Sequence, residues 1–143
     1  MLHTIKQALN SADSLALVSD NWHLDAELLL AHVLDVNREY LFTWPDKEIS
    51  AANYARFSAL VERRQKGEPV AYLRGKQAFW SFELFVNSNV LIPRPETELL
   101  VEKALMLFGA DAPEISIAEL GTGSGAIALA LATERPTWTL WAI

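Results

Sequence analysis

The chain has 143 residues, of which 51% are hydrophobic and 21% are charged, a composition typical of a globular protein with enough apolar side chains for a core. Its 12 basic and 18 acidic residues give a net charge of −6, which disfavours direct binding to nucleic acid, because phosphates require a basic surface. The lack of cysteine excludes thiolate catalysis, cysteine-bound zinc and disulfides. With no signal-peptide pattern and no apolar run near the ~20 residues of a membrane span, we expect a cytoplasmic protein that makes no contact with membranes.

Residues 1–74 show helical periodicity and predict an all-α bundle. In residues 22–34 the apolar side chains recur at the i, i+3, i+4 spacing of an amphipathic helix, and Asn21 stands at the expected N-cap. Shorter helices are expected over residues 2–9 and 38–43. We therefore expect a helical domain that ends at about residue 74.

A further helix of this bundle is expected to begin at about residue 51, with Ser50 as its cap. It ends in residues 63–66, which include the cations Arg63, Arg64 and Lys66, and Gly67 follows. These cations complement the negative end of the helix dipole, or they contact an acidic patch on a protein partner. The sequence leaves both interpretations open.

After Gly75 the periodicity changes to that of strands. Residues 77–80 and 83–86 are two β-prone runs around Ser81-Phe82, and they predict a hairpin. We expect residues 75–90 to form a β-hairpin linker between two domains.

Residues 91–95 are expected to be extended, because each of its two prolines disfavours helical backbone in the preceding residue. Helix returns over residues 96–108. Glu96 and Glu98 occupy its first turn, where the helix dipole favours acidic side chains.

Residues 115–143 predict a strand, a glycine loop, a helix and a second strand. The strands are expected over 115–120 and 138–143, and the helix over 126–133. This order is that of a βαβ unit of a parallel sheet. Since two parallel strands cannot cover both faces of a sheet, we expect residues 91–143 to be the first part of a larger α/β domain.

The loop of residues 119–125 (ELGTGSG) is the segment that we expect to bind a ligand. Gly121 permits a sharp turn after the strand, Gly123 lets the backbone approach a ligand, and Gly125 allows the helix to pack close to the sheet. The carboxylate of Glu119 would repel a phosphate, but it suits a cationic sulfonium or amino group.

Three interpretations of this loop remain open from its residues. Gly121, Gly123 and Ala126 satisfy the G-x-G-x-x-G/A fingerprint of dinucleotide-binding oxidoreductases. Three glycines at alternate positions, preceded by an acid, are closer to the donor loop of class I S-adenosylmethionine methyltransferases. A purely structural turn is the third. The acid that both enzyme classes place after the second strand would come beyond Ile143.

Four segments, in order along the chain, resemble the PrmC (HemK) family of protein-(glutamine-N5) methyltransferases. They are residues 63–73 (RRQKGEPVAYL), 79–86 (FWSFELFV), 91–98 (LIPRPETE) and 119–125 (ELGTGSG). The resemblance implies methylation of the glutamine amide in the Gly-Gly-Gln motif of class 1 peptide chain release factors. It also implies S-adenosylmethionine as cofactor, a helical domain that recruits the release factor, and a Rossmann-like domain that holds the donor.

The resemblance also assigns site residues. The donor-binding residues are Glu119, Gly121, Thr122, Gly123, Ser124 and Gly125, and the possible pocket wall is Arg94, Pro95, Glu96 and Thr97. We expect no metal ligand, because the histidines have no partners at metal-ligand spacing.

One family motif, Asn-Pro-Pro-Tyr, which grips the target amide, does not occur in the chain. We therefore expect no catalytic residue among these 143 residues, and we interpret them as the inactive front part of the enzyme. The alternatives are a fragment of an NAD-dependent oxidoreductase and a module that docks release factors without catalysis.

Overall fold

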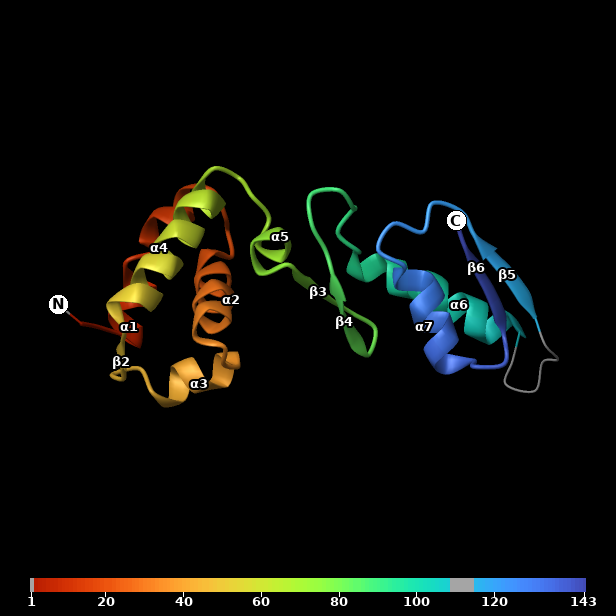
Figure 1. Cartoon of the computed structure of the whole chain (residues 1–143), viewed down its shortest axis with the longest axis horizontal. Coiled ribbons are helices and arrows are strands. Elements are labelled where there is room, and N and C mark those ends of the chain that lie inside the picture. The colour runs from red at the N-terminus through yellow and green to blue at the C-terminus, as the bar shows by residue number, and fades with distance from the viewer. Residues whose placement is uncertain (1, 109–114) are drawn as a thin grey trace. The chain divides into compact units, whose positions relative to one another are not determined.

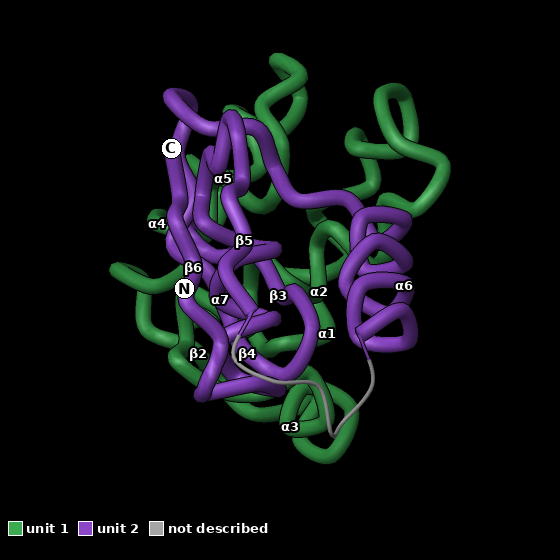
Figure 2. The backbone as a smooth tube through the Cα atoms, turned by 90° about the vertical axis from the view of Figure 1, so that its right-hand side faces the viewer, with its two compact units in different colours: residues 1–74 green, residues 75–143 purple. Residues whose placement is uncertain are grey.

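The computed structural model describes residues 2–108 and 115–143 and divides into two units, Met1–Arg74 and Gly75–Ile143 (Figures 1 and 2). Residues 109–114, part of the segment predicted to begin the donor domain, lie outside the described residues. The described residues form several helices and three two-stranded sheets, which confirms a mixed α/β chain.

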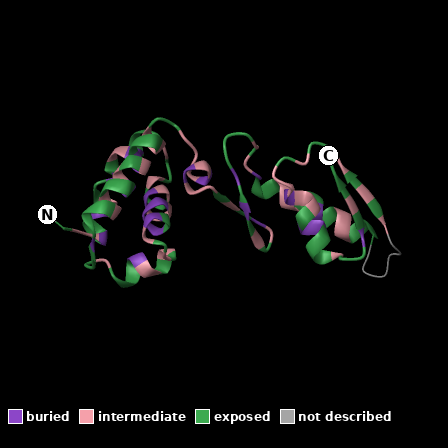
Figure 3. Ribbon diagram, in the orientation of Figure 1, coloured by how far each residue is buried: buried purple, intermediate pink, exposed green. Residues whose placement is uncertain are grey.

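Helix α2 (Trp22–Leu34) carries much of the core of the first unit (Figure 3). Its side chains Leu29 and Leu30 are fully buried, as is Phe57 from α4 (Ala51–Gln65). Burial of one such side chain stabilises a fold by about 1.5–3 kcal/mol. The helices that pack against α2 are α1 (Ile5–Asn10), the 3-10 helix η1 (Asp13–Leu17), α3 (Arg38–Thr43), α4 (Ala51–Gln65) and α5 (Val70–Arg74).

Polar side chains cap the N-termini of α1, α3 and α4. Ser50 Oγ accepts the backbone N–H of Asn53 at 3.1 Å, and Asn37 Oδ1 accepts that of Tyr40 at 3.0 Å. Asn21 directly precedes α2, as predicted for an N-cap. Its side chain, however, makes no capping hydrogen bond, so that part of the prediction is wrong. Its backbone, at φ −104° and ψ 33°, is not in the extended conformation from which a side-chain oxygen reaches the first amides.

The first unit is not purely helical, so the expected all-α bundle needs a correction. Strand β1 (His3–Thr4) pairs antiparallel with β2 (Glu48–Ile49). The amide of Ile5, at the start of α1, continues this contact by donating to Lys47 O at 3.0 Å. The pairing therefore satisfies an amide that the helix itself leaves without a partner.

The cations at the end of α4 form ion pairs within the first unit. Arg64 Nε lies 2.9 Å from Asp25 Oδ2 of α2, and both side chains are largely buried. Arg63 binds both carboxylate oxygens of Glu68, at 2.8 and 2.5 Å. Two cations of residues 63–66 are thus engaged inside the chain, an outcome that neither sequence interpretation included.

In the second unit, β3 (Lys76–Phe79) and β4 (Phe82–Phe85) form the predicted hairpin. The turn lies at Trp80-Ser81 and not at Ser81-Phe82, since Phe79 pairs with Phe82. Trp80 has φ +56°, a left-handed conformation that costs a residue with a side chain roughly 1–2 kcal/mol. Trp80 is therefore a turn residue and not the strand residue that its β propensity suggests.

Helix α6 (Glu98–Phe108) begins later than predicted, because the turn before it is a 3-10 helix, η2 (Pro95–Thr97). Val101 of α6 is completely buried. Several apolar side chains of α6 are nevertheless exposed, and Leu107 shows 78% of its surface.

Strand β5 (Ser116–Glu119), helix α7 (Ala126–Glu134) and strand β6 (Thr139–Ala142) form the predicted βαβ unit. β5 and β6 are parallel, and Glu119 pairs with Ala142 at their carboxyl ends. This places the glycine loop where both strands end.

Candidate functional site

The glycine loop leaves the end of β5 and is tied to the residue that follows β6. The amides of Gly121 and Thr122 both donate to Ile143 O, at 2.7 and 3.0 Å. Gly125 N then donates to Thr122 O at 2.9 Å, which closes a turn directly before α7. These bonds give the loop a defined path between strand and helix.

Three loop glycines have left-handed backbone: Gly121, Gly123 and Gly125 have φ of +74°, +55° and +80°. A Cβ on Gly121 would meet nothing within 4 Å, so conformation, not space, requires glycine there. The role predicted for Gly125, close packing of the helix on the sheet, is not what the structure shows. Among the described residues, a Cβ there would approach only the Leu129 side chain of α7 itself, at 3.5 Å.

Glu119 turns its carboxylate back onto the loop and the helix. Its Oε2 accepts the Thr122 hydroxyl at 2.9 Å and the backbone N–H of Ala128 at 3.1 Å. Ala128 is the third residue of α7, so the carboxylate lies at the positive end of the helix dipole. Among the described residues Oε1 makes no hydrogen bond, and it is the oxygen left for a ligand.

A pocket of about 190 Å³ connects this loop with the segment before α6. It contains most of the predicted site residues, although they come from two motifs some 25 positions apart. Its lining residues are Leu91, Ile92, Pro93, Arg94, Thr97, Glu119, Gly121, Thr122, Gly123, Ser124, Ala126 and Ile127.

Some predicted residues do not line the pocket, and some lining residues were not predicted. Three predicted residues do not line the pocket: Gly125, Pro95 and Glu96. Five lining residues were not predicted: Leu91, Ile92, Pro93, Ala126 and Ile127. The first three of these belong to the same extended, proline-bearing segment as Arg94, and that shared conformation was the available signal.

Two charged side chains, Glu119 and Arg94, line this pocket among the described residues. The carboxylate of Glu119 is half-buried and fixed, whereas Arg94 is exposed. A fixed carboxylate attracts a cation and repels a phosphate. The pocket can therefore bind a group that carries positive charge near the loop.

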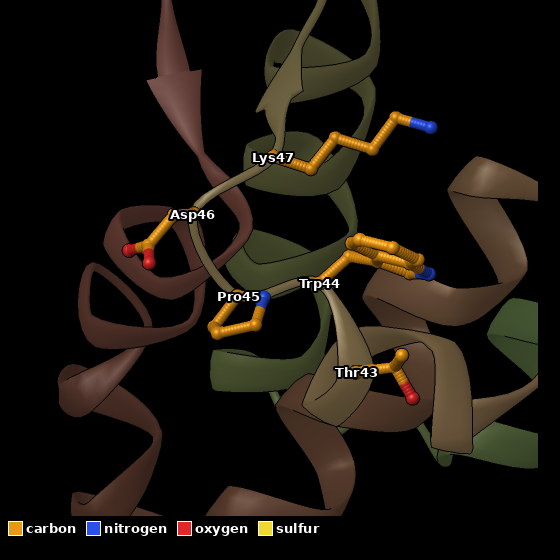
Figure 4. Close-up of a pocket in the computed structure, with 5 residues that line it drawn as sticks. All are labelled: Thr43, Trp44, Pro45, Asp46 and Lys47. Carbon is orange, nitrogen blue, oxygen red and sulfur yellow. The ribbon is translucent and has the colours of Figure 1, made fainter.

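A separate pocket of about 450 Å³ lies in the first unit, directly after α3. It is lined by Thr43, Trp44, Pro45, Asp46 and Lys47. Figure 4 shows Trp44 and Lys47 on one side of the loop and Asp46 on the other. Lys47 Nζ bonds the Tyr40 hydroxyl, while the indole of Trp44 stays 55% exposed.

Within residues 2–108 and 115–143, no three His, Cys, Asp or Glu side chains come together in a group that could hold a metal ion. His3 stacks on Tyr54 at 3.8 Å, and His23 stacks on Trp22 at 3.5 Å. In the same residues no helix combines the length and apolarity that crossing a bilayer requires.

Residues 1–75 match the model of the PrmC N-terminal domain. The chain belongs to this family. The match covers the helical unit and thus more than half of the 143 residues.

Relatives of this PrmC-family chain carry the name release factor glutamine methyltransferase. The protein of Shewanella oneidensis is 50% identical over 129 residues, which are 90% of this chain and 44% of the relative. That of Coxiella burnetii is 50% identical over 138 residues, covering 96% and 50%. That of Burkholderia pseudomallei is 46% identical over 143 residues, covering 99% and 50%. The PrmC-family chain thus spans about half the length of these relatives.

Proposed function

We propose that this chain is part of an S-adenosylmethionine-dependent methyltransferase that modifies the glutamine amide in the Gly-Gly-Gln motif of class 1 peptide chain release factors. In this proposal residues 1–74 recruit the release factor, residues 75–90 link the two domains, and residues 91–143 begin a Rossmann-like donor domain. The reaction takes place in the cytoplasm, where release factors act, and involves neither nucleic acid nor membrane directly.

The observation that supports this proposal is the pocket lined by the glycine loop and the segment before α6. Its volume of about 190 Å³ is below the ~300–1,000 Å³ of typical small-molecule sites, so it takes only part of the donor. The methionine part fits the charges best, with its ammonium near Glu119 and its carboxylate toward Arg94. When bound, the donor supplies an electrophilic methyl group on its sulfonium.

The same charges weigh against the NAD-dependent oxidoreductase. In a dinucleotide site the diphosphate lies at the glycine loop and the start of the following helix. Here the Glu119 carboxylate already accepts a hydrogen bond from the backbone N–H of Ala128, in the first turn of that helix, at 3.1 Å. A second anion beside it would be repelled.

Equilibrium titration of the 143-residue chain with S-adenosylmethionine and, separately, with NAD tests this assignment. We expect binding of the first and none of the second. Loss of donor binding in Glu119→Gln, with Glu134→Gln unaffected at the far end of α7, would place the ligand at the loop. Binding of NAD alone would contradict the methyltransferase.

Methyl transfer to an amide needs more than this pocket, because the nitrogen lone pair is delocalised into the carbonyl. Catalysis of this kind depends on holding the amide in line with the methyl group. The Asn-Pro-Pro-Tyr motif expected to do so is not among these residues. We therefore propose that the chain by itself binds and does not turn over.

A docking role for the first unit has its own support. The unit has a separate core. It exposes Trp44 (55%) in the lining of the pocket after α3, and Phe42 (60%) one residue before that lining. Exposed aromatic side chains next to a hollow are typical of protein-binding surfaces. Capture of a purified release factor should weaken in Trp44→Ala and persist in Leu17→Ala, a control whose side chain is 89% exposed in the same unit. Equal capture by both variants would argue against this surface.

A further inference from the structure

We infer that Thr122 is a positioning residue of the donor site, and that its hydroxyl fixes the Glu119 carboxylate in the direction needed to bind the cationic part of the donor. This inference rests on the proposed function. It assigns Thr122 a role that acts through Glu119 and not through direct contact with the ligand.

The first observation is how the carboxylate is held. Oε2 of Glu119 accepts two hydrogen bonds, from Thr122 Oγ1 at 2.9 Å and from Ala128 N at 3.1 Å. These donors come from different elements, one from the loop and one from α7. Two donors on one oxygen define the orientation of the whole carboxylate, and among the described residues they leave Oε1 without a hydrogen bond in a residue that lines the pocket.

The second observation is that Thr122 is itself held in place. Its amide donates to Ile143 O at 3.0 Å, and its carbonyl accepts Gly125 N at 2.9 Å. Glycines with left-handed backbone flank it on both sides. The hydroxyl is thus attached to a backbone with a defined path, so it can orient a partner.

Pre-organisation is the expected benefit. A carboxylate already fixed in its binding orientation loses little freedom when the ligand arrives, which raises affinity. Without the Thr122 hydroxyl, Glu119 keeps only the Ala128 bond and can rotate about it. Because ordering a side chain on binding lowers affinity, we expect Thr122→Val to weaken S-adenosylmethionine binding about fivefold to tenfold.

Three variants distinguish positioning from general destabilisation. Thr122→Ser keeps the hydroxyl and should bind the donor within about twofold of the unchanged chain. Thr133→Val removes a hydroxyl bond of similar length, from Thr133 Oγ1 to Leu129 O at 2.8 Å, on an exposed part of α7. It should leave donor affinity unchanged. Thermal unfolding of each variant identifies any loss of fold.

A double-mutant cycle tests whether Thr122 acts through Glu119. In a Glu119→Gln background, Thr122→Val should weaken donor binding further by less than about twofold, because coupled residues are not additive. Fully additive losses would mean direct ligand contact by Thr122 and would overturn the inference.

The outcomes separate the inference from the function on which it rests. If the unchanged chain binds no S-adenosylmethionine, the proposed donor site within these residues falls, and the inference falls with it. If the unchanged chain binds and Thr122→Val binds equally well, only the inference is overturned. A loss in Thr122→Val, rescue in Thr122→Ser and non-additivity with Glu119→Gln together support it.

Discussion

The backbone N–H of Trp80 donates to Oε1 of Glu98 at 2.7 Å, which joins the turn of the hairpin to the first residue of α6. The indole N–H of the same tryptophan donates to Oε1 of Glu134, at the end of α7, at 2.8 Å. Two carboxylates from two helices therefore hold one left-handed turn residue. The hairpin is part of the second unit, and Glu98 follows Thr97 of the pocket wall directly.

Removing the carboxylate of Glu98 should destabilise the second unit. In Glu98→Ala the half-buried Trp80 amide loses its acceptor, and an unsatisfied amide costs about 1–3 kcal/mol. Glu98→Gln retains an acceptor oxygen and should cost less. Denaturant unfolding measures both variants. The control is Glu102→Ala on the exposed face of α6, expected within about 0.5 kcal/mol of the unchanged chain. Equal losses in Glu98→Ala and Glu102→Ala would show that the Trp80 bond contributes nothing.

Left-handed backbone, and not lack of space, should govern substitutions at Gly123. Its φ is +55°, and the nearest atom to an added Cβ is Gly121 O, at 4.0 Å. Asparagine visits this conformation more readily than β-branched residues do. We therefore expect Gly123→Asn to cost roughly 1 kcal/mol of unfolding free energy and Gly123→Val clearly more. Thermal unfolding compares them. A similar loss in both variants would mean that crowding, and not φ, limits this position.

Sequence patterns predicted the elements that have strong local signals. The periodicity of residues 22–34 and the capping residue Ser50 gave helices close to α2 and α4 as observed. The strand expected over 115–120 and the helix expected over 126–133 likewise lie close to β5 and α7. The family resemblance, and not this pattern, predicted that residues 94–97 lie near the loop. Local propensity suffices where burial and backbone preference agree.

The features that were missed depend on contacts distant in sequence. The pairing of His3–Thr4 with Glu48–Ile49 spans too few residues to produce a period. Trp80 has high β propensity, yet the carboxylates of Glu98 and Glu134 hold it in a turn. The bond of Glu119 to an amide of α7 could not be foreseen either, because side-chain direction at a strand end depends on the helix that follows.

Stability should depend on pH through Glu68. Its hydrogen bonds to Arg63 lower the pKa of the Glu68 carboxyl below its ordinary value. The folded state then binds protons less readily than the unfolded state, so the ion pair stabilises the fold above the unfolded pKa. This contribution is lost as pH falls through the lower, folded pKa. Arg63 is exposed and Glu68 partly exposed, so solvent screening limits the effect.

The measurement is the unfolding temperature of the unchanged chain and of Glu68→Gln across pH. The difference between them should be present at pH 7 and should shrink below about pH 4.3, the ordinary range of a glutamate. Glu62→Gln, at an exposed position of α4 beside Arg63, serves as control for the loss of a negative charge. A difference that grows on acidification would contradict the direction of the pKa shift.

Truncation of Phe57 should affect the first unit alone. Phe57 is completely buried in a core whose members all lie between Ile5 and Leu73. Large-to-small changes at such positions cost about 3–5 kcal/mol, which is much of the ~5–15 kcal/mol stability of a typical domain. Hydrogen exchange in Phe57→Ala should therefore accelerate at the amides of Leu29 and Leu30 in α2. It should stay unchanged at the Ile143 amide, which bonds Glu119 O in the second unit. Leu17→Ala, at an exposed position, controls for substitution itself. Equal acceleration in both units would mean that they unfold as one cooperative structure, and a docking role for residues 1–74 alone would then lose its support.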